Sequence, residues 1–224
     1  MKTSIIIPVL NEAALLPEML QRLMPLKRQG CEVLIVDGGS TDGTPAIVAS
    51  AGFKLLQSAS GRAHQMNVGA ARADAEVLLF LHADSQLPEG ALALVAQALS
   101  NDAQRWGRFD VCITGHHFML RIVAHLMNLR SRLTGIATGD QAMFMTRAAF
   151  DAVAGFPEQP LMEDIELSKR LCRHSRPACI ARCVSTSGRR WETRGVWRTI
   201  LLMWRLRWDY WRGVPAGQLA RAYQ

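Results

Sequence analysis

The chain has 224 residues, of which 49% are hydrophobic and 20% charged; this balance excludes a disordered or collagen-like protein and suits one α/β domain. Its formal net charge is +7, yet eight arginines against Glu192 and Asp209 place +6 between Gly188 and the C-terminus. A general nucleic-acid binder spreads its charge over a face of the fold, so this distribution argues against nucleic acid as a partner.

The cysteines and the N-terminal segment favour a cytoplasmic protein. The five cysteines are odd in number and scattered, without a CxxC pair or a zinc-like His/Cys spacing, so we expect buried, reduced thiols. The apolar run from Ser4 to Leu10 is too short for a signal sequence. No apolar stretch approaches the ~20 residues that cross a bilayer, so we expect no transmembrane anchor.

Strands and helices alternate over the first 81 residues. Continuous apolar or β-branched runs predict strands at 4–9, 32–36, 53–57 and 77–81. Apolar residues at helical spacing and the intervening positions predict helices at 12–28, 44–51 and 63–73. This alternation is typical of a right-handed, mostly parallel open sheet flanked by helices.

The pattern changes beyond Leu99. Residues 106–118 are ambiguous, 119–133 are predicted to be helical, and the apolar run 142–146 is predicted to be a further strand. A helix is expected from the carboxylates at 163–166 through Cys172. We find no internal repeat and no low-complexity linker, so one domain is expected over residues 1–224.

Polar residues follow three of the predicted strands, at Asn11–Glu12, at Asp37–Asp42 and at His82–Asp84. Because ligands bind beyond the carboxyl ends of strands in such sheets, these clusters predict one shared site. For the cluster at Asp37–Asp42 the structural alternative is a strand-to-helix turn in which Asp42 or Thr44 caps the following helix.

His82 and Asp84 are two candidate metal ligands separated by one residue. A divalent cation on a diphosphate needs few protein ligands, because phosphate oxygens and water supply the others. The alternative is that Asp84 caps a helix near Pro88 and that His82 is a core histidine.

Three carboxylates stand within four residues at Glu163, Asp164 and Glu166. Acidic residues at a helix N-terminus are stabilised by the helix dipole, which is the structural interpretation. A carboxylate that can reach an acceptor hydroxyl is also suited to act as a general base.

Taken together, five motifs resemble family 2 glycosyltransferases. They occur in the family's order over about three quarters of the chain: Ile6–Glu12, Val36–Thr44, Arg62–Ala70, His82–Asp84 and Glu163–Asp164. The resemblance implies a GT-A (Rossmann-like) fold, a nucleotide-sugar donor, a hydroxyl acceptor that is small or lipid-linked, and inversion at the anomeric carbon.

The resemblance also implies roles for individual residues. Asp84 would bind Mg²⁺ or Mn²⁺ at the diphosphate, and Asp164 would deprotonate the acceptor hydroxyl. The other residues that it places around the donor are Pro8, Asn11, Glu12, Asp37, Arg62, Asn67, Asp140 and Arg190. For Asp140 the alternative is a turn, and for Arg190 a solvated basic loop.

This chain departs from the family at two positions. Gly38 stands where a second aspartate is common, and His82 stands where an aspartate is common. The first departure weakens the inference about the nucleotide base. The second leaves Asp84 as the firm metal carboxylate and His82 as a candidate ligand through a neutral imidazole, although oxygen suits Mg²⁺ better.

The C-terminal segment carries an aromatic stripe. Its members recur at spacings of four and three on a predicted helix, flanked by arginines: Trp197, Leu201, Trp204, Trp208 and Trp211. Burial against the domain core or a second subunit is the preferred interpretation. Peripheral contact of residues 196–212 with the cytoplasmic face of a membrane is the alternative.

We therefore expect a nucleotide-sugar-binding half at 1–105, an acceptor half at 106–195 and an amphipathic helical tail at 196–224. The alternative function is a catalytically decayed module that binds a membrane or a partner. A nucleotidyltransferase would instead show a glycine-rich basic loop after the first strand, where this chain has Pro8 to Glu12.

Overall fold

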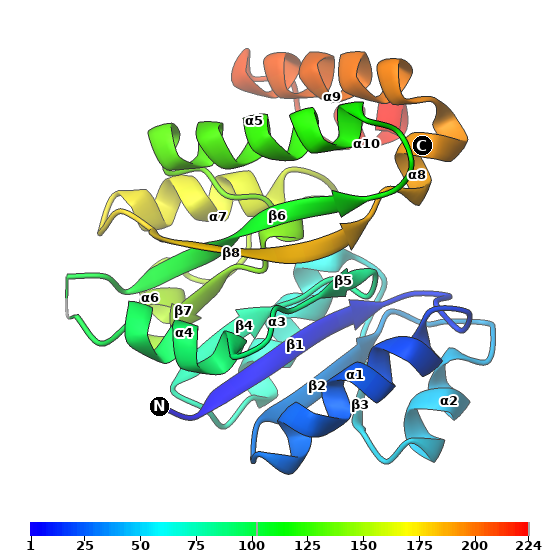
Figure 1. Ribbon diagram of the computed structural model, residues 1–224, viewed down its shortest axis with the longest axis vertical. Helices are drawn as coiled ribbons and strands as arrows, with labels where there is room; N and C mark the ends of the chain where they lie inside the picture. Colours follow the sequence, from blue (N-terminus) through cyan, green and yellow to red (C-terminus); the bar gives the residue numbers. More distant parts are fainter. Residues whose placement is uncertain (102, 224) are drawn as a thin grey trace.

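The computed structural model describes residues 1–101 and 103–223, apart from the side chain of Arg190. Its sheet has eight strands in the order β3-β2-β1-β4-β7-β6-β8-β5, with helices packed on both faces (Figure 1). The strands are β1 Thr3–Val9, β2 Glu32–Asp37, β3 Lys54–Gln57, β4 Val77–Phe80, β5 Ser85–Gln86, β6 Trp106–Thr114, β7 Phe144–Thr146 and β8 Ala178–Ser187.

Eleven helical segments accompany the sheet in the described residues. They are α1 Leu16–Arg28, α2 Thr44–Ser50, α3 Arg62–Arg72, α4 Ala91–Ala98, α5 Met119–Thr134, the 3-10 turn η1 Gly139–Gln141, α6 Arg147–Ala152, α7 Glu163–Cys172, α8 Arg189–Arg194, α9 Val196–Trp211 and α10 Ala216–Tyr223. Strands β3, β2, β1 and β4 pair in parallel, as do β6 and β8, whereas β7 is antiparallel to both of its neighbours. The predicted α/β fold with a mostly parallel open sheet is confirmed.

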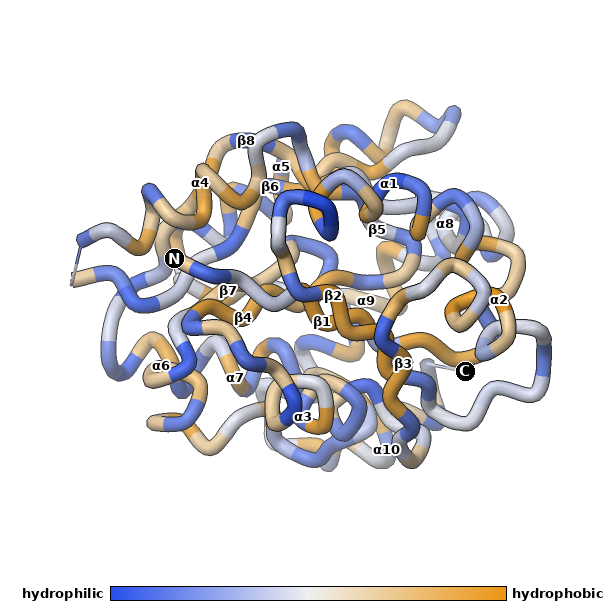
Figure 2. The backbone as a smooth tube through the Cα atoms, turned by 90° about the horizontal axis from the view of Figure 1, so that it is seen from below, coloured by the Kyte–Doolittle hydropathy of each residue, from blue (hydrophilic) through white to orange (hydrophobic). Residues whose placement is uncertain are grey.

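The apolar strands are buried on both faces of the sheet, which explains their continuous hydrophobic runs. Ile5 and Ile7 of β1 pack toward α1, whereas Ile6 packs toward α3. The backbone tube of β1 and β2 is strongly hydrophobic in Figure 2. A Cβ on Gly69 of α3 would lie 2.4 Å from Cγ2 of Ile6, so a glycine there lets α3 approach the sheet closely.

Several element boundaries differ from the predictions. Helix α1 begins at Leu16 rather than at residue 12, because a turn from Glu12 to Leu15 precedes it and Pro17 favours a helix start. The ambiguous stretch after residue 105 is strand β6 up to Thr114. Strands β5 and β8 had no clear sequence signal, since β5 has two residues and β8 mixes small, basic and polar side chains.

Two expectations about burial are wrong. Of the five free cysteines only Cys31 is buried, and Cys112 is exposed on β6. The aromatic stripe of α9 is not packed on the core of the chain, since its five members are between 57% and 73% exposed, while the alternative of burial against a second subunit stays a prediction. The other side of α9 packs inward instead, through Val196, Thr199 and Leu206.

Candidate active site

The carboxylate of Asp37 orders the loop that follows β2. Asp37 is 1% exposed, and its oxygens accept hydrogen bonds from the backbone N–H of Gly39 at 3.2 Å and of Ser40 at 3.1 Å, and from the Ser40 hydroxyl. Gly39 has a φ of +90°, a conformation that glycine adopts without strain. Asp37 therefore shapes the carboxyl edge of the sheet, and its contact with a nucleotide stays a prediction.

The loop after β1 is tied to the loop after β2. Oδ1 of Asn11 accepts a hydrogen bond from the N–H of Thr41 at 2.8 Å, and the N–H of Asn11 donates to Oγ of Ser40 at 2.8 Å. The N–H of Glu12 donates to Oγ1 of Thr44 at 2.9 Å. The structure thus brings Asn11 and Glu12 beside the Asp37 loop, as their place at strand ends predicted.

A buried glutamine fills the space beside Gly38. Gln65 of α3 is 3% exposed, and its Nε2 donates to the carbonyls of Val9 and Val36, each at 2.8 Å. A Cβ on Gly38 would lie 3.0 Å from the amide atoms of Gln65. These hydrogen bonds join α3 to the ends of β1 and β2, next to half-buried Pro8. Because Gln65 fills the space beside residue 38, a larger aspartate side chain would not fit there, which is a physical reason for Gly38.

We expect Gly38→Ala to lower the free energy of unfolding by about 1–3 kcal/mol, because its methyl group would press on an amide that two hydrogen bonds hold. In a Gln65→Ala background the same substitution should cost less than about 0.5 kcal/mol. Urea denaturation of the parent, both single variants and the double variant measures this coupling. An equal cost in both backgrounds would show that Gln65 does not impose the glycine.

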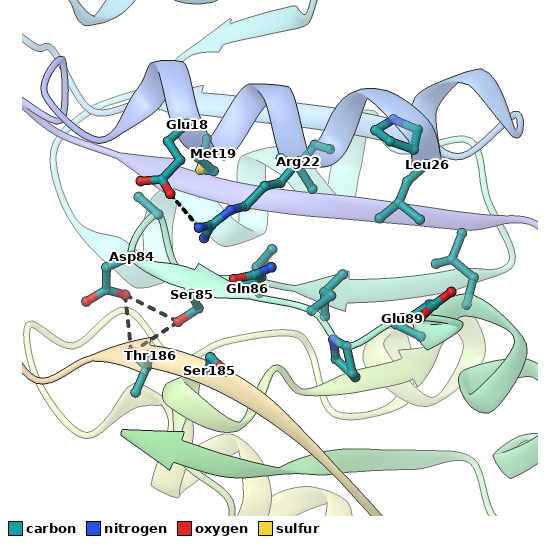
Figure 3. Close-up of a pocket in the computed structure, with 18 of the residues that line it drawn as sticks. Glu18, Met19, Arg22, Leu26, Asp84, Ser85, Gln86, Glu89, Ser185 and Thr186 are labelled. Carbon is teal, nitrogen blue, oxygen red and sulfur yellow. Dashed lines mark hydrogen bonds and ion pairs between the residues drawn. The ribbon is translucent and has the colours of Figure 1, made fainter. Parts of the chain in front are cut away.

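Asp84 lies at the carboxyl end of β4 on the rim of an open groove (Figure 3). Its Oδ1 accepts hydrogen bonds from Oγ of Ser85 at 3.2 Å and from Oγ1 of Thr186 at 3.5 Å, so the pairing of β5 with β8 orients the carboxylate. The groove has a volume of about 890 Å³ and runs between α1, the segment 83–93 and the end of β8. Asp84 is itself exposed, which leaves its carboxylate accessible to a ligand.

Glu12, Asp84 and Arg189 form a charged group at this edge. Partial burial raises the pKa of Glu12, and the negative charge of Asp84 raises it further, whereas Arg189 at the start of α8 acts in the opposite sense. Carboxylates from the ends of β1 and β4 therefore influence each other, with one arginine nearby. A divalent cation would be attracted to the two carboxylates of this group, and a diphosphate to its arginine.

His82 faces the segment 139–140, and its predicted role as a metal ligand beside Asp84 stays a prediction. Its Nδ1 lies 3.5 Å from Oδ1 of Asp140, and its Nε2 lies against Gly139, where a Cβ would be only 2.3 Å away. Both ring nitrogens thus face the segment 139–140. Among the described residues no group of three His, Cys, Asp or Glu side chains could hold a metal ion.

A second cluster of charges gathers around the N-terminus of α7. Oδ2 of Asp164 accepts a hydrogen bond from the N–H of Gly139 at 2.8 Å, and Oδ1 accepts one from the N–H of Ile165 at 2.7 Å. Nη1 of Arg62 lies 3.5 Å from Oε1 of buried Glu163. His82, Gly139, Glu163 and Asp164 also line one small cavity, so the ends of β4 and α7 meet there.

Burial raises the pKa of Asp164 to about 6, and the charge of Glu163 adds to this effect. The two backbone hydrogen bonds and Arg62 oppose it. Burial would lower the pKa of Arg62, but the carboxylates of Glu163, Asp140 and Asp164 raise it overall. Asp164 is therefore a carboxylate that can gain or lose a proton near neutral pH, as a general base requires.

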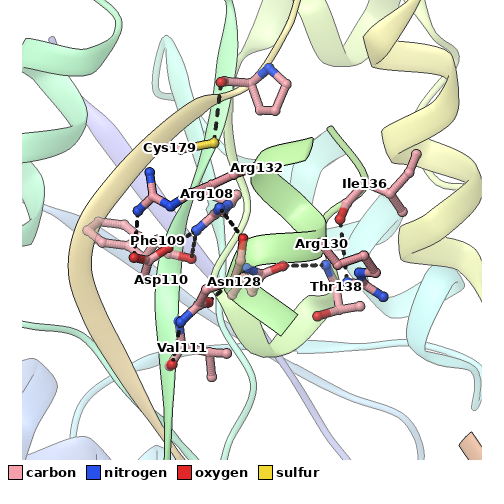
Figure 4. Close-up of polar contacts among 12 residues, drawn as sticks. Arg108, Phe109, Asp110, Val111, Asn128, Arg130, Arg132, Ile136, Thr138 and Cys179 are labelled. Atoms are coloured by element: carbon pink, nitrogen blue, oxygen red, sulfur yellow. Dashed lines mark hydrogen bonds and ion pairs between the residues drawn. The ribbon is translucent and has the colours of Figure 1, made fainter. Parts of the chain in front are cut away.

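Arg130 of α5 connects this cluster to a polar network between β6 and α5 (Figure 4). Burial lowers the pKa of Arg130, Asp164 acts against this shift, and Arg108 adds to it. Arg108 is fully buried and donates to Asp110 and, at 3.3 Å, to the carbonyl of Asn128. Its charge is thus balanced inside the protein by Asp110.

We expect Asp110→Ala to lower the free energy of unfolding by about 3 kcal/mol, because it leaves the Arg108 guanidinium buried without its carboxylate. Glu18→Ala is the matched control, since it removes the acid from an exposed arginine pair with Arg22, and should cost less than about 1 kcal/mol. Chemical denaturation of both variants measures these two changes in the free energy of unfolding. Similar small costs for the two would mean that Asp110 is not needed to balance Arg108.

Asn67 binds the backbone of Phe156, and its predicted place in the donor pocket stays a prediction. Its Oδ1 accepts a hydrogen bond from the N–H of Phe156, and its Nδ2 donates to the carbonyl of Phe156, both at 2.9 Å. The amide thus holds the loop before α7 in place. Arg62 faces the Asp164 cluster rather than the groove beside Asp84.

Some predicted and observed site residues do not match. The side chain of Arg190 lies outside the described residues, so its predicted contact with the diphosphate stays a prediction. Thr186 and Arg130 were not among the predicted site residues, whereas Arg189 belongs to the basic segment of predicted Arg190. No local motif marks Thr186 or Arg130, because the tertiary fold alone brings β8 and α5 to these carboxylates.

Comparisons with known proteins agree with this fold. The family model "Glycosyl transferase family 2" matches residues 4–152. The β-monoglucosyldiacylglycerol synthase of Synechocystis sp. is 26% identical over 91% of this chain and 48% of its own length. The chain therefore spans about half the length of this curated relative.

Solved structures resemble the chain closely in fold. The structure of S. aureus TarS 1-349 in complex with UDP-GlcNAc has a TM-score of 0.68 and 20% identity, over 84% of this chain and 58% of that one. The mannosyltransferase PcManGT from Pyrobaculum calidifontis, in complex with GDP-Man and Mn²⁺, has a TM-score of 0.64 and 23% identity, over 83% and 56%. The family model covers well over half of the chain, and the chain belongs to glycosyl transferase family 2.

Proposed function

We propose that this glycosyltransferase moves a sugar from a nucleotide diphosphate to a hydroxyl group with inversion at the anomeric carbon. The observation that supports this best is the placement of Asp164, with its raised pKa, beside the same strand end that carries exposed Asp84. Asp84 faces an open groove, and Asp164 faces a partly buried cluster. The two carboxylates are thus suited to different parts of one reaction.

The donor side of the proposed site is the edge formed by Glu12, Asp84 and Arg189. Asp84 would hold Mg²⁺ or Mn²⁺ together with the diphosphate, and the cation would stabilise the charge that develops on the leaving nucleotide. A single oriented carboxylate suits this role only if phosphate oxygens complete the coordination. His82 is the weaker candidate ligand, because both of its ring nitrogens face residues 139–140.

The acceptor side of the proposed site is the cluster around Asp164. The acceptor oxygen would attack the anomeric carbon as the bond from that carbon to the phosphate oxygen breaks, and its proton would pass to Asp164. The N–H groups of Gly139 and Ile165 hold the carboxylate of Asp164 in place for this step, and Arg62 pairs with the neighbouring Glu163. Asp140, next to Gly139, would contact the donor sugar from the acceptor side.

A lipid or lipid-linked hydroxyl compound is the acceptor class that we favour. The Synechocystis relative is named for a glucosyl diacylglycerol product, and a second relative, from Sodalis glossinidius, is named for an undecaprenyl-phosphate substrate. Neither name identifies the acceptor or the sugar of this chain.

A panel of UDP-, GDP- and TDP-sugars, screened by thermal shift with and without Mn²⁺, tests the proposal. A donor that binds the native state should raise the unfolding temperature, and Mn²⁺ should act only when a nucleotide is present. Slow Mn²⁺-dependent hydrolysis of the same donor should follow. If no nucleotide sugar binds or turns over with any divalent metal, the chain is instead a catalytically decayed module on this fold.

A further inference from the structure

Helices α5 and α9 expose an unusual amount of apolar surface. Of the twelve large hydrophobic side chains that are exposed in the described residues, ten belong to these two helices or directly precede α5. We call them the α5–α9 surface: Phe118, Ile122, Leu126, Leu129, Leu133, Trp197, Leu201, Trp204, Trp208 and Trp211. Their exposed fractions lie between 43% and 73%. Exposed apolar patches on this scale mark sites of interaction.

The ten side chains form one surface because the two helices are neighbours. Leu120 and Ala124 of α5 share a hydrophobic cluster with Val196 and Ile200 of α9. The cluster also contains Val111 and Ile113, in the second half of β6, and α5 lies between β6 and α9 in Figure 1. At roughly 100° per residue, each stripe covers a sector of only about 80° on its helix. On each helix the exposed stripe lies beside the side that packs against the other helix. The two stripes are therefore neighbours on the protein surface.

Basic residues border this surface on its two outer margins. By the same helical geometry Arg121, His125 and Arg132 follow the side of α5 that is remote from α9, and Nη2 of Arg132 lies 2.6 Å from Oδ2 of Asp110 on β6. Arg198, Arg205 and Arg212 follow the side of α9 that is remote from α5. Asp209 is the one acidic residue in the two helices, and its Oδ2 lies 3.6 Å from Nε of Arg205.

We propose that the α5–α9 surface docks the protein on an anionic membrane surface, with the two helices lying in the plane of the interface. Tryptophan and leucine would enter the boundary between head groups and acyl chains, and the arginines on both margins would meet lipid phosphates. No helix among the described residues is long and apolar enough to span a bilayer. A second copy of the chain fits less well, because its margins would be equally basic.

The docked surface lies over the acceptor side of the site. Leu206 of α9 packs with Met162 and Ile165 at the start of α7, and the charge of Asp164 acts on the pKa of Arg130 in α5. Docking would therefore hold the Asp164 cluster close to the membrane, on the inner side of α9. This last step rests on the proposed function, whereas docking itself does not.

Vesicle flotation of the intact chain tests the proposal. The protein should float with phosphatidylcholine vesicles that contain about 30% phosphatidylglycerol, bind pure phosphatidylcholine less, and dissociate in part at high salt. Leu126→Ser combined with Trp204→Ser should lower the ratio of bound to free protein by about tenfold or more, because both side chains are exposed and leave the core intact.

Charge reversal supplies a matched pair of variants. Arg198→Glu with Arg205→Glu should weaken binding to anionic vesicles, whereas Arg28→Glu with Arg72→Glu, an equal change of charge on α1 and α3, should not. Binding that is absent in the parent, or unchanged by Leu126→Ser with Trp204→Ser, would overturn the proposal. A dimer that these two serines dissociate would assign the surface to a second copy.

Donor turnover in the same variants separates this proposal from the proposed function. Mn²⁺-dependent hydrolysis of a nucleotide sugar in solution should be equal in the parent and in the Leu126→Ser, Trp204→Ser variant. Asp84→Asn should keep vesicle binding while it loses turnover. Vesicle binding by a parent chain without turnover would refute only the transferase, and turnover without vesicle binding would refute only the docking surface.

Discussion

Replacing Asp84 by asparagine should lower kcat/KM for the nucleotide sugar by about 10³-fold or more, since metal stabilisation of a leaving group is worth several kcal/mol and each tenfold is about 1.4 kcal/mol. Asp84 is the exposed carboxylate at the donor edge, and Ser85 and Thr186 orient it. The amide keeps the size of the side chain but loses the charge that a divalent cation requires. Initial rates at saturating Mn²⁺ measure the effect.

Asp151→Asn is the control for this substitution, because Asp151 is an exposed carboxylate on α6 and lies outside the two clusters. It should leave the rate unchanged. In Asp84→Asn, Mn²⁺ should also lose its effect on the thermal stability of the nucleotide-bound protein. A variant that still responds to Mn²⁺ at parental concentrations would show that another group holds the cation.

Asp164→Asn should lower kcat by about 10³-fold, within the range that a general base contributes, while the donor binds as in the parent chain. Asparagine retains acceptors and donors at the position but cannot take a proton from the acceptor hydroxyl. Single-turnover rates give the chemical step, and thermal shift with the donor confirms binding. Parental kcat in this variant would exclude Asp164 as the base.

The dependence of kcat/KM on pH gives an independent signature of Asp164. Burial and Glu163 raise its pKa to about 6, so it is deprotonated and able to act as a base above that pH. Activity should fall about tenfold per pH unit as the pH decreases below 6. Glu163→Gln removes a charge that raises this pKa, so it should move the acidic limb to lower pH. An acidic limb that stays at the same pH in Glu163→Gln would show that a group other than Asp164 titrates there.

The two carboxylates differ in how well they could be predicted. Asp84 follows a fully apolar strand, and a parallel sheet places the residues at such strand ends on one edge, so its location followed from the pattern. The motifs around Asp164 marked a helix start, and α7 does begin at Glu163. The raised pKa of Asp164 could not be predicted, because its main cause is burial, and the opposing contacts come from Gly139 and Arg62 in distant segments.

His82 and Asn67 show the limit of reasoning from motifs. The sequence places His82 two residues before Asp84, which suggested a shared ligand, but contacts with residues 139 and 140 direct its ring elsewhere. Asn67 was predicted from its motif alone, which gave no sign that its amide binds the backbone of Phe156. In both cases the partner lies far along the chain, so no local pattern could reveal it.

By itself the sequence determined the fold class, the alternation of the first four strands with their helices and the sheet edge where the polar strand ends gather, because hydrophobic periodicity and strand ends are local properties. It also showed that residues 197 to 211 form an apolar stripe. Only the tertiary structure decided that the stripe is exposed and that α5 adjoins it. The face that a helix buries depends on the elements packed against it, and here β6, α7 and α10 take the opposite side of α9 and leave the tryptophans outside.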